Sequence, residues 1–201
     1  MQKKRLHIIS FDNPFPPNYG GVVEVFYKIK ALHAIGIEIY LHCFVDEIPT
    51  ECKALKEVAK EVFFYKKNKN PLLFFSSLPL SVRVRDNKKL IENITKINAP
   101  ILFEGHKTTY WVSKKQLAGF DKYIRLHNLE DLYFSGLASS ENSLLKKILY
   151  HFEAKKYVKY NSVLSSFIKV FSLSKFENEV TNNQFKNSVY IPVFHGNENV
   201  V

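Results

Sequence analysis

The sequence predicts an α/β fold: a doubly wound, mainly parallel, Rossmann-like sheet flanked by helices. Two observations carry this prediction. Short apolar runs rich in β-branched residues, typical of buried strands, recur along the chain, and segments with helical spacing separate most of them. Strands that alternate with helices favour a parallel sheet with helices on both faces. The 201 residues are enough for one domain or for one large lobe of a bigger protein.

The first half of the chain opens on an isoleucine-rich run and then a loop with three prolines that closes on Tyr-Gly-Gly. Apolar residues then repeat at helical spacing from Val22 to Leu32, and Gly36 ends that pattern. We predict strands at Arg5–Phe11, Ile37–Val45 and Val62–Tyr65, and a second helix at Glu51–Ala59.

The second half continues the alternation, although residues 71–85 have no clear pattern. Asp86 is a candidate N-cap for a helix to Ile97, and Ser174 with Glu177 forms a capping-box sequence. We predict strands at Pro100–Glu104, Lys122–His127, Phe167–Leu173 and Val189–Val193, and helices at Thr108–Leu117, Leu129–Leu137, Glu141–Val158 and after Ser174.

The composition excludes few functions. The net charge is +10, but the lysines are spread along the chain and select no partner. No helix-turn-helix, zinc-finger or RNP-type pattern occurs, so no specific nucleic acid is expected. Cys43 and Cys52 have neither metal-ligand spacing nor a disulfide framework. With no signal peptide and no apolar run near the ~20 residues that span a bilayer, we expect a cytoplasmic location.

The loop before the first helix is the first candidate for chemistry. It is longer than a G-x-G-x-x-G turn and lacks that fingerprint, so we expect no nicotinamide or flavin cofactor. Gly20 and Gly21 nevertheless open the helix. They either permit the turn alone or bring backbone N–H groups close to an anionic ligand such as a phosphate.

Two histidines end predicted strands. His106 and His127 should therefore lie at the carboxyl edge of the sheet, where α/β proteins bind ligands. Each either contacts a substrate or is held structurally by loop carbonyls. Asn128 suits the N-cap of the next helix, and Glu130 complements the dipole of its first turn. That structural account of Glu130 is complete without a catalytic role, which stays open.

Several segments, in order, resemble the acceptor-side lobe of family 4 glycosyltransferases of the GT-B fold. The proline-rich loop with Gly-Gly is similar to their opening, and residues 101–106 to their fourth-strand exit. Residues 125–134, Arg-Leu-His-Asn-Leu-Glu-Asp-Leu-Tyr-Phe, resemble their R-x-H-N-x-E-x-x-Y-[YF] segment, and residues 152–157, 171–177 and 190–193 resemble the segments that follow. The resemblance covers essentially the whole chain.

The resemblance implies a cleft between two lobes, of which residues 1–194 form one and residues 195–201 begin the linker to the other. It implies transfer of a sugar from a nucleotide-sugar donor to a glycan or lipid-linked acceptor in bacterial surface polysaccharide biosynthesis, generally with retention and without a metal. The missing lobe would hold most of the donor, so this chain alone is expected to be inactive. The candidate catalytic residues are His127 and Glu130, and the candidate substrate-binding residues are Asn18, Tyr19, Gly20, Gly21, His106 and Asn128.

Two alternatives remain open at this stage. A non-catalytic α/β ligand-binding or regulatory domain would have the same fold, because fold does not determine function. The lysines of the predicted helix at Glu141–Val158 form either a solvated basic face or a peripheral membrane contact. The solvated face is favoured, because the apolar stripe from Leu144 to Phe152 gives way to lysines.

Overall fold

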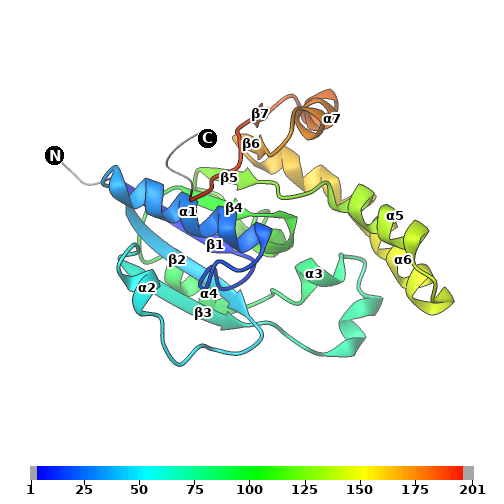
Figure 1. Ribbon diagram of the computed structural model, residues 1–201, viewed down its shortest axis with the longest axis horizontal. Helices are drawn as coiled ribbons and strands as arrows, with labels where there is room; N and C mark the ends of the chain where they lie inside the picture. Colours follow the sequence, from blue (N-terminus) through cyan, green and yellow to red (C-terminus); the bar gives the residue numbers. More distant parts are fainter. Residues whose placement is uncertain (1–3, 197–201) are drawn as a thin grey trace.

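A computed structural model describes residues 4–196 and shows a single seven-stranded parallel sheet in the order β3-β2-β1-β4-β5-β6-β7 (Figure 1). This confirms the predicted fold class. All seven predicted strands are present, most of them a residue or two shorter than expected. They are β1 Arg5–Ser10, β2 Glu38–Val45, β3 Glu61–Lys66, β4 Ile101–Glu104, β5 Lys122–Arg125, β6 Lys169–Ser172 and β7 Ser188–Tyr190.

Seven α-helices and four 3₁₀ segments connect the strands within the described residues. The α-helices are α1 Gly20–Ala34, α2 Lys53–Lys56, α3 Leu80–Arg83, α4 Lys88–Ile94, α5 Glu130–Ser140, α6 Leu144–Tyr160 and α7 Lys175–Phe185. The 3₁₀ segments are η1 Pro71–Phe75, η2 His106–Trp111, η3 Lys115–Leu117 and η4 Asn161–Ser166.

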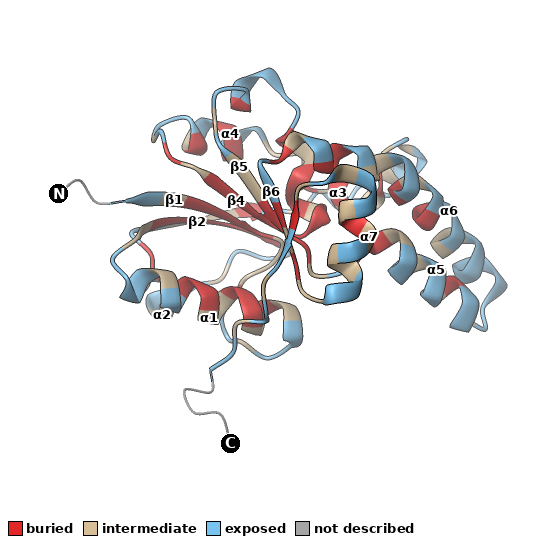
Figure 2. Ribbon diagram, turned by 90° about the horizontal axis from the view of Figure 1, so that it is seen from above, coloured by how far each residue is buried: buried red, intermediate tan, exposed pale blue. Residues whose placement is uncertain are grey.

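The strand order explains the layers. From β1 to β3 the chain moves toward one edge of the sheet, and from β3 onward it moves toward the other. Because parallel crossovers are right-handed, the two directions place their helices on opposite faces. Figure 2 shows α1 and α2 below the strands and α4 above them. Val25 and Ile29 of α1 pack on Leu41 on one face, and Phe103 and Ile124 belong to the core on the other.

Three helix predictions needed correction. The segment Thr108–Leu117 is not an α-helix but contains most of η2 and all of η3. The hydroxyls of Thr108 and Thr109 donate to the carbonyls three residues earlier, at 2.9 and 2.7 Å, which competes with α-helical pairing. The helix expected at Glu51–Ala59 is only the single turn α2.

Asp86 is not the N-cap of α4. Its carboxylate is paired with Arg83, and the next residue, Asn87, caps the helix by accepting from Lys89 N at 3.1 Å. The capping box of α7 is confirmed: the Ser174 side chain accepts from Glu177 N at 3.1 Å, and Glu177 Oε2 accepts from Ser174 N at 3.2 Å.

The histidines of β1 and β2 are structural. They form a chain of hydrogen bonds inside the sheet: Ile97 O to His7 Nε2 is 2.9 Å, His7 Nδ1 to His42 Nε2 is 3.0 Å, and His42 Nδ1 to Tyr65 Oη is 2.9 Å. Because the Ile97 carbonyl can only accept, His7 donates from Nε2 and accepts at Nδ1. His42 then donates to His7 and accepts from Tyr65, so both rings are neutral.

We predict that acid destabilises the fold well before the carboxylates titrate. Burial lowers the pKa of His7, lowers the pKa of His42 well below the ordinary range, and lowers that of buried His106 to about 4. In the unfolded chain all three titrate near ~6.5. As the pH falls below that value, the unfolded state binds more protons and the free energy of unfolding decreases, by up to ~1.4 kcal/mol per pH unit for each histidine.

Urea unfolding at pH values between 7.5 and 5.0 checks this. His106→Phe should reduce the dependence of the free energy of unfolding on pH by about a third, because it removes one of the three buried histidines. Phenylalanine suits this position because neither ring nitrogen of His106 makes a hydrogen bond to a described residue. A free energy of unfolding that does not change over this range would contradict neutral, buried histidines.

Candidate functional site

A cavity of about 480 Å³ lies at the carboxyl ends of the central strands. The loops that follow β1, β4, β5 and β6 contribute to its wall, together with the first turns of α1 and α5. This is the edge at which parallel α/β sheets bind ligands. Its lining residues are Phe11, Tyr19, Gly20, Gly21, Glu24, Gly105, Lys107, His127, Asn128, Glu130, Tyr133, Leu173 and Val193.

Beside this cavity, charged side chains are buried between the sheet and α1. Glu104 and Arg125 are the last residues of β4 and β5 and are partners in the strand register. They alternate with Phe103 and Ile124, which belong to the core on the far face, so both charged side chains face α1. Glu24 and Lys28 of α1 are one helical turn apart and meet them there.

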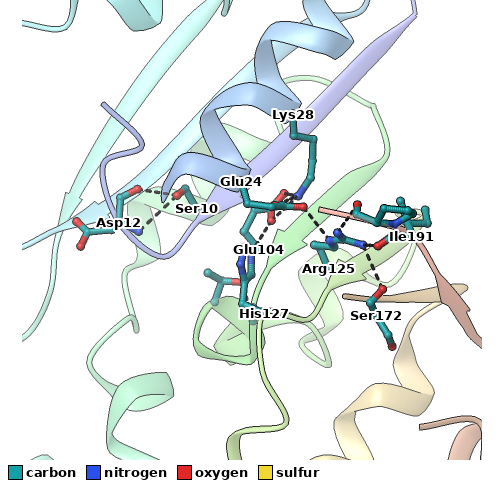
Figure 3. Close-up of polar contacts among 12 residues, drawn as sticks. Ser10, Asp12, Glu24, Lys28, Glu104, Arg125, His127, Ser172 and Ile191 are labelled. Carbon is teal, nitrogen blue, oxygen red and sulfur yellow. Dashed lines mark hydrogen bonds and ion pairs between the residues drawn. The ribbon is translucent and has the colours of Figure 1, made fainter. Parts of the chain in front are cut away.

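These four residues and His127 form one connected network (Figure 3). The Lys28 ammonium donates to both oxygens of Glu104 at 2.8 Å and is 2.9 Å from Glu24 Oε2. Arg125 Nε donates to Glu24 Oε1 at 2.9 Å. His127 Nε2 is 2.9 Å from Glu104 Oε2. All except His127 are at most 4% exposed, so each charge depends on its partners.

The charges in this network balance when His127 is neutral, since two carboxylates face one ammonium and one guanidinium. Burial raises the pKa of Glu104, but Lys28 and His127 outweigh it and lower that pKa to about 2, which keeps Glu104 ionised. An ionised carboxylate only accepts, so the Nε2 of His127 carries the proton. In the neutral ring, the state in which the charges balance, the Nδ1 atom has the free lone pair, and the ring lines the cavity.

Glu24, Glu104 and His127 also bring three potential metal ligands within 4.8 Å of one another. The position between the two carboxylates is filled by the Lys28 ammonium, at 2.8 to 2.9 Å from both. A metal ion there would have to displace a buried ammonium that both carboxylates bind. These residues therefore fit a charge-balancing role and do not fit a metal site.

Glu130 is a second buried carboxyl group at the cavity. It is 2% exposed, and its Oε1 is 3.4 Å from Lys107 Nζ. Its Oε2 has no hydrogen-bond partner among the described residues. Burial raises its pKa, an effect that Lys107, Arg85 and His127 oppose. An unpaired buried oxygen of this kind is suited to contact a polar ligand.

The loop after β1 carries the two glycines to the cavity. Tyr19, the N-cap of α1, makes no side-chain cap hydrogen bond, so its side chain leaves the first N–H groups of α1 uncapped. A Cβ atom at Gly20 would meet nothing within 4 Å, whereas one at Gly21 would lie 2.8 Å from Phe11 Cζ. Phe11 in turn packs edge-on against His127, with ring centroids 5.1 Å apart. The contact with Phe11 thus favours glycine at position 21, whereas no such contact favours glycine at position 20.

The structure brings most of the predicted site residues together. Tyr19, Gly20, Gly21, His127, Asn128 and Glu130 all line the cavity. Asn128 lines it without capping α5, because the N-cap is Leu129, which has no side-chain cap bond. Asn18 is exposed and outside the lining.

His106 differs from the expectation that it faces the cleft. It is 1% exposed, packs among the rings of Tyr157 and Tyr160, and does not line the cavity. The reason is the backbone of Gly105, whose φ of 75° turns the chain back under the sheet edge directly after β4.

Sequence reasoning missed the four buried charges. Their signals were present: Glu104 ends one predicted strand, Arg125 lies inside another, and Glu24 and Lys28 fall beside the apolar stripe of α1. Charged residues at such positions are rarely buried unless they are paired. The pairing itself depends on strand order, which spacing along the chain does not give.

Comparison with known proteins supports the fold. The sequence matches no protein-family model. A curated relative, an uncharacterized 44.6 kDa protein in the cps region of Klebsiella pneumoniae, is 29% identical over 201 residues, covering 95% of this chain and 51% of the relative. The chain therefore spans about half the length of that relative.

Two solved structures share the fold. LpCGTa in complex with UDP has a TM-score of 0.56 at 8% identity, covering 98% of this chain and 55% of that one. Phytolacca americana UGT2, complexed with UDP-2-fluoro-glucose and pterostilbene, has a TM-score of 0.52 at 9% identity, covering 94% and 53%. The chain has the fold of one GT-B lobe. At such identities the likeness shows fold alone, and the resemblance to family 4 stays a prediction.

Proposed function

We propose that this GT-B lobe is the acceptor side of a glycosyltransferase that moves a sugar from a nucleotide-sugar donor to a glycan or lipid-linked acceptor. The relative in a cps, or capsule polysaccharide, region supports a role in surface polysaccharide biosynthesis. The UDP and UDP-2-fluoro-glucose in the structures of similar fold make UDP-sugars the donor class to test first. Most of the donor would be held by a second lobe outside these 201 residues.

The observation that carries the proposal is the His127–Glu104 pair beside the cavity. Glu104 fixes the tautomer of His127, so that Nδ1 accepts a hydrogen bond from the acceptor hydroxyl. As that oxygen bonds to the anomeric carbon and the bond to the diphosphate breaks, the hydroxyl proton passes to Nδ1. The nucleoside diphosphate leaves, and the imidazolium is held against Glu104.

Other cavity residues support this chemistry by binding. The first N–H groups of α1 at Gly20 and Gly21 suit an anionic group such as a donor phosphate. The unpaired Oε2 of Glu130 suits a sugar hydroxyl. The family 4 resemblance predicts retention at the anomeric carbon, whereas direct proton removal by His127 predicts inversion. The anomeric configuration of the product, read by NMR, separates these two outcomes.

A transfer assay tests the proposal. The full-length protein, incubated with a panel of sugar nucleotides and a glycan and lipid extract of its own cells, should release nucleoside diphosphate. Residues 1–201 alone should release none. If the full-length protein turns over no sugar nucleotide in the panel, the result favours the alternative of a non-catalytic ligand-binding domain. Robust turnover by residues 1–201 alone would contradict the proposal that a second lobe is needed to hold the donor.

The same assay separates binding from packing at the glycines. Gly20→Ala should leave the melting temperature nearly unchanged, since the added methyl group meets open space. If the Gly20 backbone contacts a ligand, this variant should raise KM by about tenfold, equivalent to ~1.4 kcal/mol of binding. An unchanged KM would assign Gly20 to the turn alone.

A further inference from the structure

The α5–α6 hairpin exposes large apolar side chains on a face that no other described part of the chain covers. On α6, Leu144 is 73% exposed and Leu145 is 69% exposed, and Ile148 and Phe152 are also exposed. At 100° per residue these four lie within about a third of the helix circumference. The buried residues Glu153, Ala154 and Tyr157 lie on the opposite side of α6. The apolar stripe therefore points away from the protein.

The 3₁₀ segment η1 extends this surface. Its Leu72 is 68% exposed and its Phe75 is 83% exposed. Lys156 of α6 holds η1 in place: its ammonium donates to the Phe74 carbonyl at 2.6 Å and lies 4.4 Å from the centre of the Phe74 ring. Lys156 is one turn after Phe152, so η1 lies beside the apolar stripe. We call Leu72, Phe75, Leu144, Leu145, Ile148 and Phe152 the apolar edge.

Basic residues accompany the apolar edge. The helix α6 has five lysines against one carboxylate, Glu153, which is itself paired with Lys156. Lys155 and Lys159 continue the line of the stripe along the same face, and both are exposed. The lysines that interrupt the stripe in the sequence therefore lie at one end of the exposed apolar surface. Figure 2 shows the two helices projecting from the body with mostly exposed surfaces.

We propose that the apolar edge docks on an anionic lipid bilayer, with its leucines and phenylalanines at the level of the acyl chains and Lys155 and Lys159 on the headgroups. Charge complementarity identifies this occupant, because a second copy of the chain would bring one lysine-rich surface against another. None of the described helices has the length and hydropathy to cross a bilayer, so the contact is with the surface.

The position of α5 gives this docking a consequence for the cavity. Tyr133 in its first turns lines the cavity near His127, and Ala138 and Ser139 toward its other end line a groove of about 700 Å³ that Leu144, Ile148 and Phe152 share. One short helix thus joins the apolar edge to the cavity. A membrane-embedded acceptor would reach His127 along α5. This last step rests on the proposed function, whereas the docking of the apolar edge does not depend on it.

Vesicle co-sedimentation of the full chain tests the docking, independently of any sugar transfer. Vesicles of phosphatidylcholine with phosphatidylglycerol should bind the protein, and vesicles of phosphatidylcholine alone should bind it much less. Leu144→Ser/Leu145→Ser should weaken binding at least about tenfold, since burial of each leucine side chain in the acyl boundary is lost. Lys155→Gln/Lys159→Gln should weaken it by a similar factor and reduce its salt dependence.

The matched control is Ile35→Ser/Phe176→Ser, two comparably exposed apolar residues at the end of α1 and on α7. It should bind as the wild type does. The proposal is overturned if the wild type does not bind the anionic vesicles, or if the leucine variant binds as tightly as the wild type. It is also overturned if sedimentation shows a dimer that the leucine variant dissociates, because a second copy is then the occupant.

Discussion

Replacing Arg125 with methionine should lower the free energy of unfolding by about 3–5 kcal/mol, the cost of breaking a buried ion pair. Arg125 is 1% exposed and donates to Glu24, to Ile191 O at 2.8 Å and to Pro192 O at 2.9 Å. Methionine fills much of the volume but makes none of these bonds. Glu24 would keep only Lys28, which Glu104 already shares.

Chemical denaturation measures this effect, and the melting temperature should fall by about 10 °C for a domain of this size. Arg5→Met is the matched control: Arg5 also pairs with a glutamate, Glu38 at 3.3 Å, but its side chain is 48% exposed. Its loss should cost at most about 1 kcal/mol. If the two variants lose the same free energy of unfolding, the buried Arg125 network stabilises the fold no more than the exposed Arg5–Glu38 pair does.

The second large effect concerns His127. In the full-length protein His127→Ala should lower kcat by about a hundredfold, the lower range for a lost general base, with a smaller change in KM. Removing the ring leaves Glu104 with both of its hydrogen bonds from Lys28, so the fold should persist. Release of nucleoside diphosphate at saturating acceptor extract measures kcat, and circular dichroism checks the fold.

His33→Ala is the control for that measurement, because His33 lies in the last turn of α1, among residues that do not line the cavity. It should keep kcat within about twofold of the wild type, well under 1 kcal/mol of barrier. A His127→Ala enzyme with wild-type kcat and KM would make His127 structural, and Glu130 would then be the carboxyl group to test next.

The sequence predicted the strands and the order of the helices because these depend on local apolar periodicity. It also predicted the cavity edge, since strand ends gather there in a parallel sheet. It failed where tertiary partners decide the outcome. The carboxylate of Asp86 is taken by Arg83, so Asn87 caps α4 instead. His106 comes two residues after β4, as His127 comes two residues after β5, yet the turn at Gly105 puts His106 in the core.

The candidate site, like the fold, could be predicted from the sequence only in part. His127 and Glu130 could be singled out because His127 ends a predicted strand and Glu130 follows it in the first turn of the next helix. The partner that orients His127 could not, because Glu104 lies 23 residues away and only the pairing of β4 with β5 brings the two together. For α6, helical spacing shows that Leu144 to Phe152 share a face, but it does not show that this face points outward.

The hydrogen bonds from Arg125 to two consecutive backbone carbonyls affect where a chimeric protein should join this lobe to another. Ile191 and Pro192 are held by the same guanidinium that binds Glu24, so the direction in which the backbone leaves β7 is set from inside the charged network. A crossover point placed before Pro192 would separate that guanidinium from the backbone it orients. A crossover point after Phe194 would keep Arg125, Ile191 and Pro192 together. The backbone would then leave this lobe in its native direction, and a donor half grafted from a longer relative would follow that direction.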